Sequence, residues 1–139
     1  MSKECPFCRI ASGEAAASIV YEDKNVLAFM DLSPATVGHT LVIPREHWEN
    51  IYAVPEETLT KLITVVKRIS VAVKKTFSAD GITVIQNNGR AAGQAVFHLH
   101  FHVIPVNSNS EIRRGQHGRV ASERTRLDET AQKIRENLY

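Results

Sequence analysis

The sequence predicts a single domain that combines short strands with helices, and three observations indicate this. The chain has 139 residues, of which 43% are hydrophobic and 23% charged, which is ordinary for one soluble globular domain. Short apolar runs bounded by turn-forming residues predict five strands, near residues 19–21, 26–30, 39–44, 82–85 and 96–105. Apolar residues at helical spacing predict one long helix over residues 55–77.

The N-terminal segment places two cysteines three positions apart, Cys5 and Cys8, before an expected helical turn at residues 9–12. A redox pair of this spacing normally lies within a thioredoxin-like βαβ pattern, and no strand is expected before Cys5. A structural zinc site would need two further ligands, because such sites are usually four-coordinate. Two thiols without a chemical role remain a third possibility.

Polar side chains border the second and third expected strands. Asp31 ends the second strand, where aspartate commonly caps a loop. His39 opens the third strand and His47 follows it. The strand pattern alone does not assign these three residues a catalytic, ligand-binding or metal-binding role.

The long helix is expected to be structural. Pro55, Glu56 and Glu57 mark its first turn. The residues expected to face the core are Leu59, Leu62, Ile63, Val66, Ile69, Val73 and Phe77. A second, C-terminal helix is expected after Ser122 as its cap, with Leu127, Ile134 and Leu138 on its inner face.

The segment between the last two strands, residues 86–94, is polar and contains two glycines. Adjacent antiparallel strands need only about two to five residues to connect. The extra length favours a loop that presents backbone N–H groups to an anion, over a plain hairpin connection.

Three histidines alternate with apolar residues in the last expected strand: His98, His100 and His102. Successive side chains of a strand point to opposite faces, so the imidazoles share one face at roughly 6.6 Å spacing, from a rise of about 3.3 Å per residue. A row of solvated histidines, or one core histidine beside two exposed ones, is disfavoured, because chance alternation of three histidines with apolar residues is improbable in a chain with only six. The chemical alternatives are a zinc ion bound by these histidines, and nucleophilic catalysis by an imidazole.

Charge and hydropathy limit the partners. Residues 1–105 carry ten basic and ten acidic side chains, and residues 106–139 carry seven and five, which gives the net charge of +2. This excess is too small to predict nucleic acid as the main partner. No apolar run approaches ~18 residues and the start lacks an apolar stretch, so we expect no membrane segment, no signal peptide and a cytoplasmic location.

Together these motifs resemble the histidine triad (HIT) family, and most closely the small prokaryotic-type proteins of its Hint-like branch. The resemblance spans Cys5 to Pro105. It includes Cys-Pro-Phe-Cys at residues 5–8, Ala-Phe-Met-Asp-Leu-Ser-Pro at 28–34, Gly-His-Thr-Leu-Val-Ile-Pro at 38–44, the loop 86–94 and the triad itself.

The resemblance implies an α+β fold, an antiparallel sheet with packed helices, in a homodimer whose sheets join. Residues 1–139 would form a single HIT domain, with a core over 1–105 and a C-terminal loop and helix over 106–139. The implied activity is hydrolysis or transfer at the α-phosphate of purine nucleotide conjugates, through a nucleotidyl intermediate on His100. The other implied site residues are His102 and His39 beside the phosphate, Asp31 at the ribose, Phe29 and Leu32 near the base, and Asn87, Gly93 and Gln94 near the phosphates.

The chemistry of imidazole agrees with that role. Neutral imidazole is a competent nucleophile near pH 7, given its usual pKa of about 6.5. One ring nitrogen must face phosphorus while an acceptor holds the other and fixes the tautomer.

The resemblance also suggests a structural Zn²⁺. Galactose-1-phosphate uridylyltransferases, distant relatives, hold zinc with a C-x-x-C pair and two histidines. The matching residues here are Cys5, Cys8, His47 and His98. Four such ligands leave no open position, which is typical of a structural site.

Two departures from the family pattern bear on the activity. Ala95 stands where many relatives carry Ser or Thr, whose hydroxyl protonates the leaving group, so we expect slower turnover or a leaving group that needs no acid. A nucleotide-binding regulatory module with weak residual activity is therefore one alternative, and a zinc hydrolase using all three triad histidines is another. The C-terminal 34 residues lack the Trp-containing ending of eukaryotic relatives, and we expect the tail, with Arg113, Arg114 and Arg119, to influence leaving-group preference.

Overall fold

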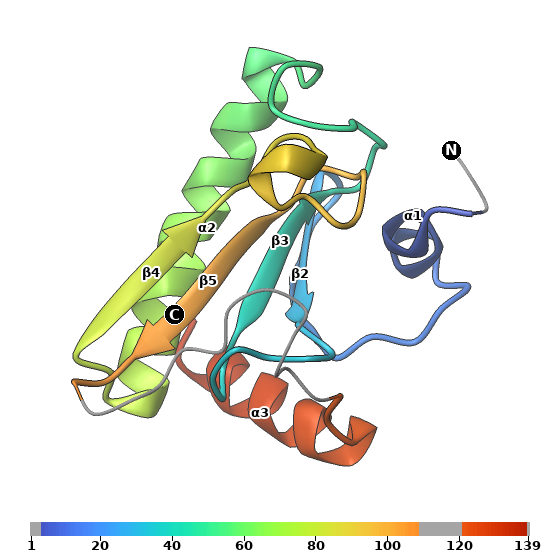
Figure 1. Cartoon of the computed structure of the whole chain (residues 1–139). Coiled ribbons are helices and arrows are strands. Elements are labelled where there is room, and N and C mark those ends of the chain that lie inside the picture. The colour runs from blue at the N-terminus through green and yellow to red at the C-terminus, as the bar shows by residue number, and fades with distance from the viewer. Residues whose placement is uncertain (1–3, 109–120, 139) are drawn as a thin grey trace.

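In the part of the chain that the structure describes, the fold is one antiparallel sheet with three α-helices (Figure 1). The computed structural model describes residues 4–108 and 121–138, so Arg113, Arg114 and Arg119 of the tail lie outside the described residues. The elements are α1 (Pro6–Ala11), β1 (Ile19–Glu22), β2 (Val26–Met30), β3 (Thr40–Pro44), α2 (Glu56–Phe77), β4 (Gly81–Ile85), the 3₁₀ turn η1 (Arg90–Ala92), β5 (Phe101–Val106) and α3 (Arg124–Glu136). The strands lie in the order β1-β2-β3-β5-β4, and every pair is antiparallel. The expected α+β class is confirmed.

The two faces of the sheet are covered by different helices. Val26, Ala28 and Met30 of β2 pack into a core with α2 and α3. Leu27 and Phe29 of the same strand pack into a second cluster with α1. Because strand side chains alternate between faces, this division follows directly from the order of residues in β2.

Helix α2 has the expected polarity, with Glu56 and Glu57 in the first turn and Lys74 and Lys75 in the last. Its buried residues are Leu62, Val65, Val66, Ile69, Ala72 and Val73. Ile63 is 49% exposed, so its assignment to the core was wrong: Val65 and Ala72 take inward positions instead. No described helix combines the length and hydropathy needed to cross a lipid bilayer.

Several expected boundaries differ from the structure. The helical turn expected at residues 9–12 is α1, which begins earlier, at Pro6. The regular strand β5 begins at Phe101, not at residue 96, because the N–H of Leu99 is donated to the carbonyl of Trp48 at 2.7 Å. Ser122 does not cap α3: its backbone N–H is donated to the Leu32 carbonyl, and Glu123 precedes the helix without a side-chain cap.

Gly38, directly before His39, has no room for a side chain. Its φ is +100°, and an added Cβ would lie 2.4 Å from Cε2 of Phe77. We expect Gly38→Ala to lower the free energy of unfolding by about 2–4 kcal/mol, from left-handed strain plus overpacking. Gly13→Ala is the matched control, since Gly13 has a φ of +85° and nothing within 4 Å. Equal losses for the two variants in urea unfolding would contradict the packing argument.

Candidate functional site

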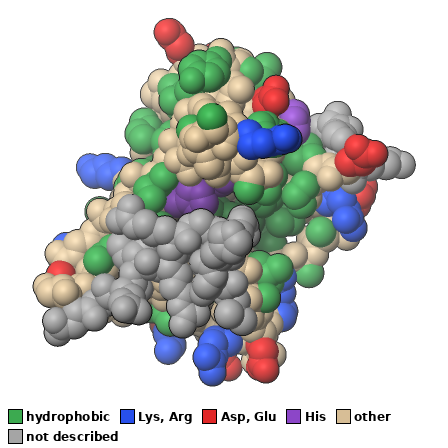
Figure 2. Space-filling view, in the orientation of Figure 1, with side chains coloured by type: hydrophobic (Ala, Val, Ile, Leu, Met, Phe, Trp, Pro, Cys, Tyr) green, Lys and Arg blue, Asp and Glu red, His purple; other side chains and the backbone are tan. Residues whose placement is uncertain are grey.

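The triad lies on the face of the sheet opposite α2. Leu99, Phe101 and Val103 enter the core with α2. His98 and His100 contact Phe7 of α1, with ring centroids 5.9 and 5.2 Å apart. The alternation of the sequence therefore directs the triad to one face. Figure 2 shows histidine side chains at the surface, bordered by apolar side chains.

His98 lies among the cysteines. Its Nδ1 is 3.4 Å from Sγ of Cys5 and 3.6 Å from Sγ of Cys8. Nδ1 of His47 is 3.2 Å from Sγ of Cys8. The four ligand atoms lie within 4.8 Å of one another, although up to 93 residues separate them in the chain.

These residues fit a tetrahedral zinc ion. Zn–S and Zn–N bonds of about 2.3 and 2.0–2.1 Å at tetrahedral angles place S and N about 3.5 Å apart, close to the distances above. Nε2 of His98 donates to the carbonyl of Pro44 at 2.8 Å, so Nδ1 keeps the lone pair that a metal needs. Burial lowers the pKa of His98 to about 4, and the ring is therefore neutral at pH 7.

His100 presents one unprotonated nitrogen. Its Nδ1 donates to the carbonyl of His98 at 2.8 Å, which leaves the lone pair on Nε2. The residue is 8% exposed. Burial lowers the pKa of His100 below its usual 6.5, although the hydrogen bond to the His98 carbonyl acts in the opposite direction. A neutral ring with a free Nε2 is the state that a nucleophile requires.

His102 is oriented by a chain of hydrogen bonds. The N–H of Ala35 is donated to Nδ1 of His39 at 3.0 Å, so the neutral His39 ring carries its proton on Nε2. That Nε2 lies 2.9 Å from Nδ1 of His102 and 3.4 Å from Oδ2 of Asp31. Because His39 donates from Nε2, Nδ1 of His102 is the acceptor. The proton of His102 is therefore on Nε2, from which it can be donated to an anionic oxygen.

The three triad imidazoles do not converge on one point. His98 belongs to the cysteine cluster, and His102 belongs to a second cluster with Asp31 and His39. His100 belongs to neither cluster. The arrangement in the described residues thus does not support a zinc ion held by all three triad histidines.

The loop 86–94 is held in place by hydrogen bonds of the buried Gln94 side chain. The side chain of Gln94 is 3% exposed, donates to the carbonyl of Glu49 at 2.7 Å and accepts from the N–H of Gly89 at 2.7 Å. Gly89 and Gly93 have positive φ values of 90° and 94°. An added Cβ on Gly93 would lie 3.7 Å from Nδ2 of Asn87. Gln94 therefore shapes the loop, while contact of Asn87, Gly93 and Gln94 with phosphate stays a prediction.

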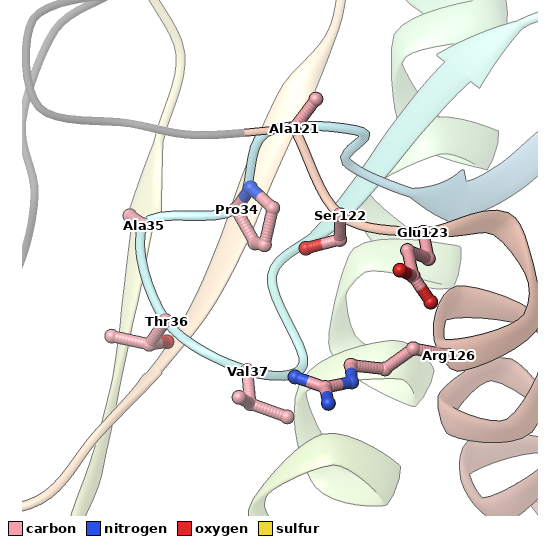
Figure 3. A pocket seen from close by; sticks show the side chains of 8 residues that line it. All are labelled: Pro34, Ala35, Thr36, Val37, Ala121, Ser122, Glu123 and Arg126. Carbon is pink, nitrogen blue, oxygen red and sulfur yellow. The ribbon is translucent and has the colours of Figure 1, made fainter.

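The residues expected near the nucleoside differ in exposure. Leu32 is 52% exposed, whereas Phe29 is 3% exposed and packs edge-on against Phe7 at 5.4 Å. Asp31 accepts a hydrogen bond from the N–H of Ser33 at 2.8 Å. A neighbouring pocket of about 550 Å³ lies between the loop 34–37 and the start of α3 (Figure 3). Of the predicted site residues that the structure describes, none lines this pocket.

Two participants were missed from the sequence. Phe7 has no role in the sequence-based prediction, and its contacts with His98 and His100 are visible only in the structure. The backbone N–H of Ala35 sets the tautomer of His39, and no sequence signal identifies such a contact.

Comparison with known proteins adds independent evidence. A family model described as "HIT domain" matches residues 12–109. An uncharacterized HIT-like protein of Saccharolobus solfataricus is 50% identical over 102 residues, 73% of each chain. An adenosine 5'-monophosphoramidase of Candida albicans is 36% identical over 105 residues, 73% of this chain and 69% of the relative.

Solved structures of similar proteins superpose on nearly the whole of this chain. A Hit-like protein from Bartonella henselae superposes with a TM-score of 0.92 at 41% identity, covering 99% of this chain and 98% of the other. A zinc-bound histidine triad family protein from Mycobacterium smegmatis has a TM-score of 0.85 at 38% identity, covering 97% and 93%. With its triad, its fold and its sequence in agreement, the chain belongs to the HIT domain family.

Proposed function

We propose that this protein is a nucleotide hydrolase or transferase that acts at the α-phosphate of purine nucleotide conjugates, either phosphoramidates or dinucleoside polyphosphates. The observation that carries the proposal is the tautomer of His100, whose buried Nδ1–H is held by the His98 carbonyl. Nε2 is then the nucleophilic atom. The relative from Candida albicans, an adenosine 5'-monophosphoramidase, supports this class of substrate.

The reaction would proceed in two steps. Nε2 of His100 forms a bond to the α-phosphorus as the bond from phosphorus to the leaving group breaks, and the leaving group takes up a proton from solvent water. Water then attacks the nucleotidyl-histidine, which releases the nucleotide, returns a proton to solvent and restores neutral His100. The Nε2–H of His102 would donate to a phosphate oxygen and stabilise the charge that builds there. Asp31 would accept hydrogen bonds from the ribose, with Leu32 beside the base and Phe29 behind it.

Zinc would have a structural role, held by Cys5, Cys8, His47 and His98. A bound Zn²⁺ would supply four bonds that join α1 to the loop after β3 and to the start of the triad. The zinc-bound relative from Mycobacterium smegmatis supports this assignment.

A substrate panel tests the function. We expect purified protein to hydrolyse AMP and GMP phosphoramidates or dinucleoside polyphosphates, with kcat/KM falling in His102→Ala. The alternative is a nucleotide-binding regulatory module with weak residual activity, which Ala95 favours because it lacks the hydroxyl of many relatives. Tight AMP binding without turnover of any panel member would support that alternative.

The pKa of His100 predicts an unusual pH dependence. Protonation of Nε2 blocks attack, so the rate falls as pH drops through the pKa of His100. Because burial lowers that pKa below 6.5, we expect the single-turnover rate of nucleotidylation to fall with a midpoint below pH 6.5. A loss of rate centred at or above pH 6.5 would contradict this.

A homodimer that extends the sheet is proposed as the assembly. Strand β4 is at the edge of the sheet, and its Val84 is 45% exposed. Ile63 and Val71 of α2 are 49% and 59% exposed. Edge strands with exposed apolar residues are suited to pairing with another chain. We expect Val84→Asp to convert a dimer to a monomer in light scattering, while Val37→Asp, at a position 64% exposed in the loop before β3, leaves the dimer intact. A monomeric wild type at micromolar concentration would refute the assembly.

A further inference from the structure

Phe7 joins the cysteine cluster to the proposed nucleophile. It lies between Cys5 and Cys8, is 8% exposed, and meets His98, His100 and Phe29 in edge-to-face contacts at 5.9, 5.2 and 5.4 Å. Edge-to-face packing holds a ring in a defined plane, which an aliphatic contact does not do as well.

His100 needs such a contact. One hydrogen bond, from Nδ1 to the His98 carbonyl, fixes one atom of the imidazole. The ring plane, and with it the direction of the Nε2 lone pair, depends on the neighbouring rings. Those neighbours are Phe7 and His102, whose ring centroid is 5.0 Å from that of His100.

Phe7 in turn depends on the cysteines. Helix α1 has six residues, which is too short to be stable alone. The N–H of Cys8 donates to Sγ of Cys5 at 3.3 Å, and both sulfurs lie against imidazole nitrogens. The bonds that would fix α1 most firmly are those of the cysteines to zinc.

We propose that Phe7 is a positioning residue for His100, and that through Phe7 the zinc site controls the rate of nucleotidyl transfer. This inference rests on the proposed function. The bound nucleotide would be held by other residues, so loss of the Phe7 ring should slow the transfer step with little change in nucleotide affinity.

The test compares Phe7→Leu with Phe7→Tyr in zinc-loaded full-length protein. We expect the single-turnover rate of nucleotidylation to fall about 30- to 100-fold in Phe7→Leu, since small misplacement of reacting groups has effects of this size. The AMP dissociation constant from calorimetry should stay within about threefold. Phe7→Tyr, which retains the ring, should restore most of the rate. Ile134→Val in α3, where Ile134 is fully buried far along the chain from the triad, controls for a general loss of stability.

A second measurement covers the case in which Phe7→Leu fails to fold or to retain zinc. Zinc is removed from wild-type protein with a chelator, and ¹⁵N spectra of the imidazoles are recorded with and without metal. We expect His100 to change from a single Nδ1–H tautomer to a mixture, together with a fall in the transfer rate at unchanged AMP affinity.

The outcomes separate the two proposals. An unchanged transfer rate in Phe7→Leu, or an unchanged His100 tautomer and rate in folded zinc-free protein, would overturn the positioning role. A rise in the AMP dissociation constant that accounts for the whole effect would also overturn it, because Phe7 would then act on binding. Failure of wild-type protein to become nucleotidylated on any panel substrate would overturn the proposed function instead.

Discussion

His100→Ala should lower kcat by about 10⁴-fold or more, because removal of the nucleophile closes the covalent route entirely. The fold should persist, since the imidazole makes one hydrogen bond to its own segment and its removal leaves no charge unpaired. Rapid-quench and steady-state assays measure the loss, and thermal unfolding and zinc content show that the variant is folded.

Matched variants make this result specific. His102→Ala should lose less activity, because it removes stabilisation of the phosphate and keeps the nucleophile. Zinc content should be unchanged in both variants, since neither residue lies in the Cys5, Cys8, His47 and His98 cluster. Near-wild-type turnover by His100→Ala would refute the mechanism.

Cys5→Ser should remove the zinc and lower Tm by about 10 °C or more. Binding of metal by the folded state alone contributes directly to the free energy of folding, and a loss of about 3–5 kcal/mol corresponds to such a shift in a domain of this size. Wild-type protein prepared without chelator should contain one zinc per chain, and its two thiols should react only after a chelator is added.

The conservative variant Cys5→His tests the same site, because it retains a ligand at that position. It should keep more zinc and a higher Tm than Cys5→Ser. A wild-type protein without metal, with two thiols that titrate freely, would show that the cluster is not a zinc site.

Local patterns predicted much of the sheet. The bounds of β2 are those expected, since the turn residues 23–25 precede it and Asp31 follows it. The burial of Leu99, Phe101 and Val103 followed from alternation alone. These features could be predicted because they depend only on residues that are neighbours in the sequence.

Features that depend on contacts between residues far apart in the sequence were harder to predict. The strand pattern of His98 and His100 is interrupted because the N–H of Leu99 is donated to Trp48, 51 positions earlier. Helical periodicity did not separate Ile63, which faces outward, from Val65, which faces the sheet. The grouping of His47 with Cys8 came from family resemblance, and the contact of Phe7 with His100 required the structure.

The most direct test of the central claim is to trap the covalent intermediate. Wild-type protein is mixed with an AMP phosphoramidate, quenched within one turnover under conditions that preserve phosphorus–nitrogen bonds, and analysed by intact mass and peptide fragmentation. We predict one added adenylyl group per chain, located on His100 and absent from His100→Ala. Turnover of the substrate with no adenylylated protein at any time, or an adenylyl group on another residue, would contradict the account.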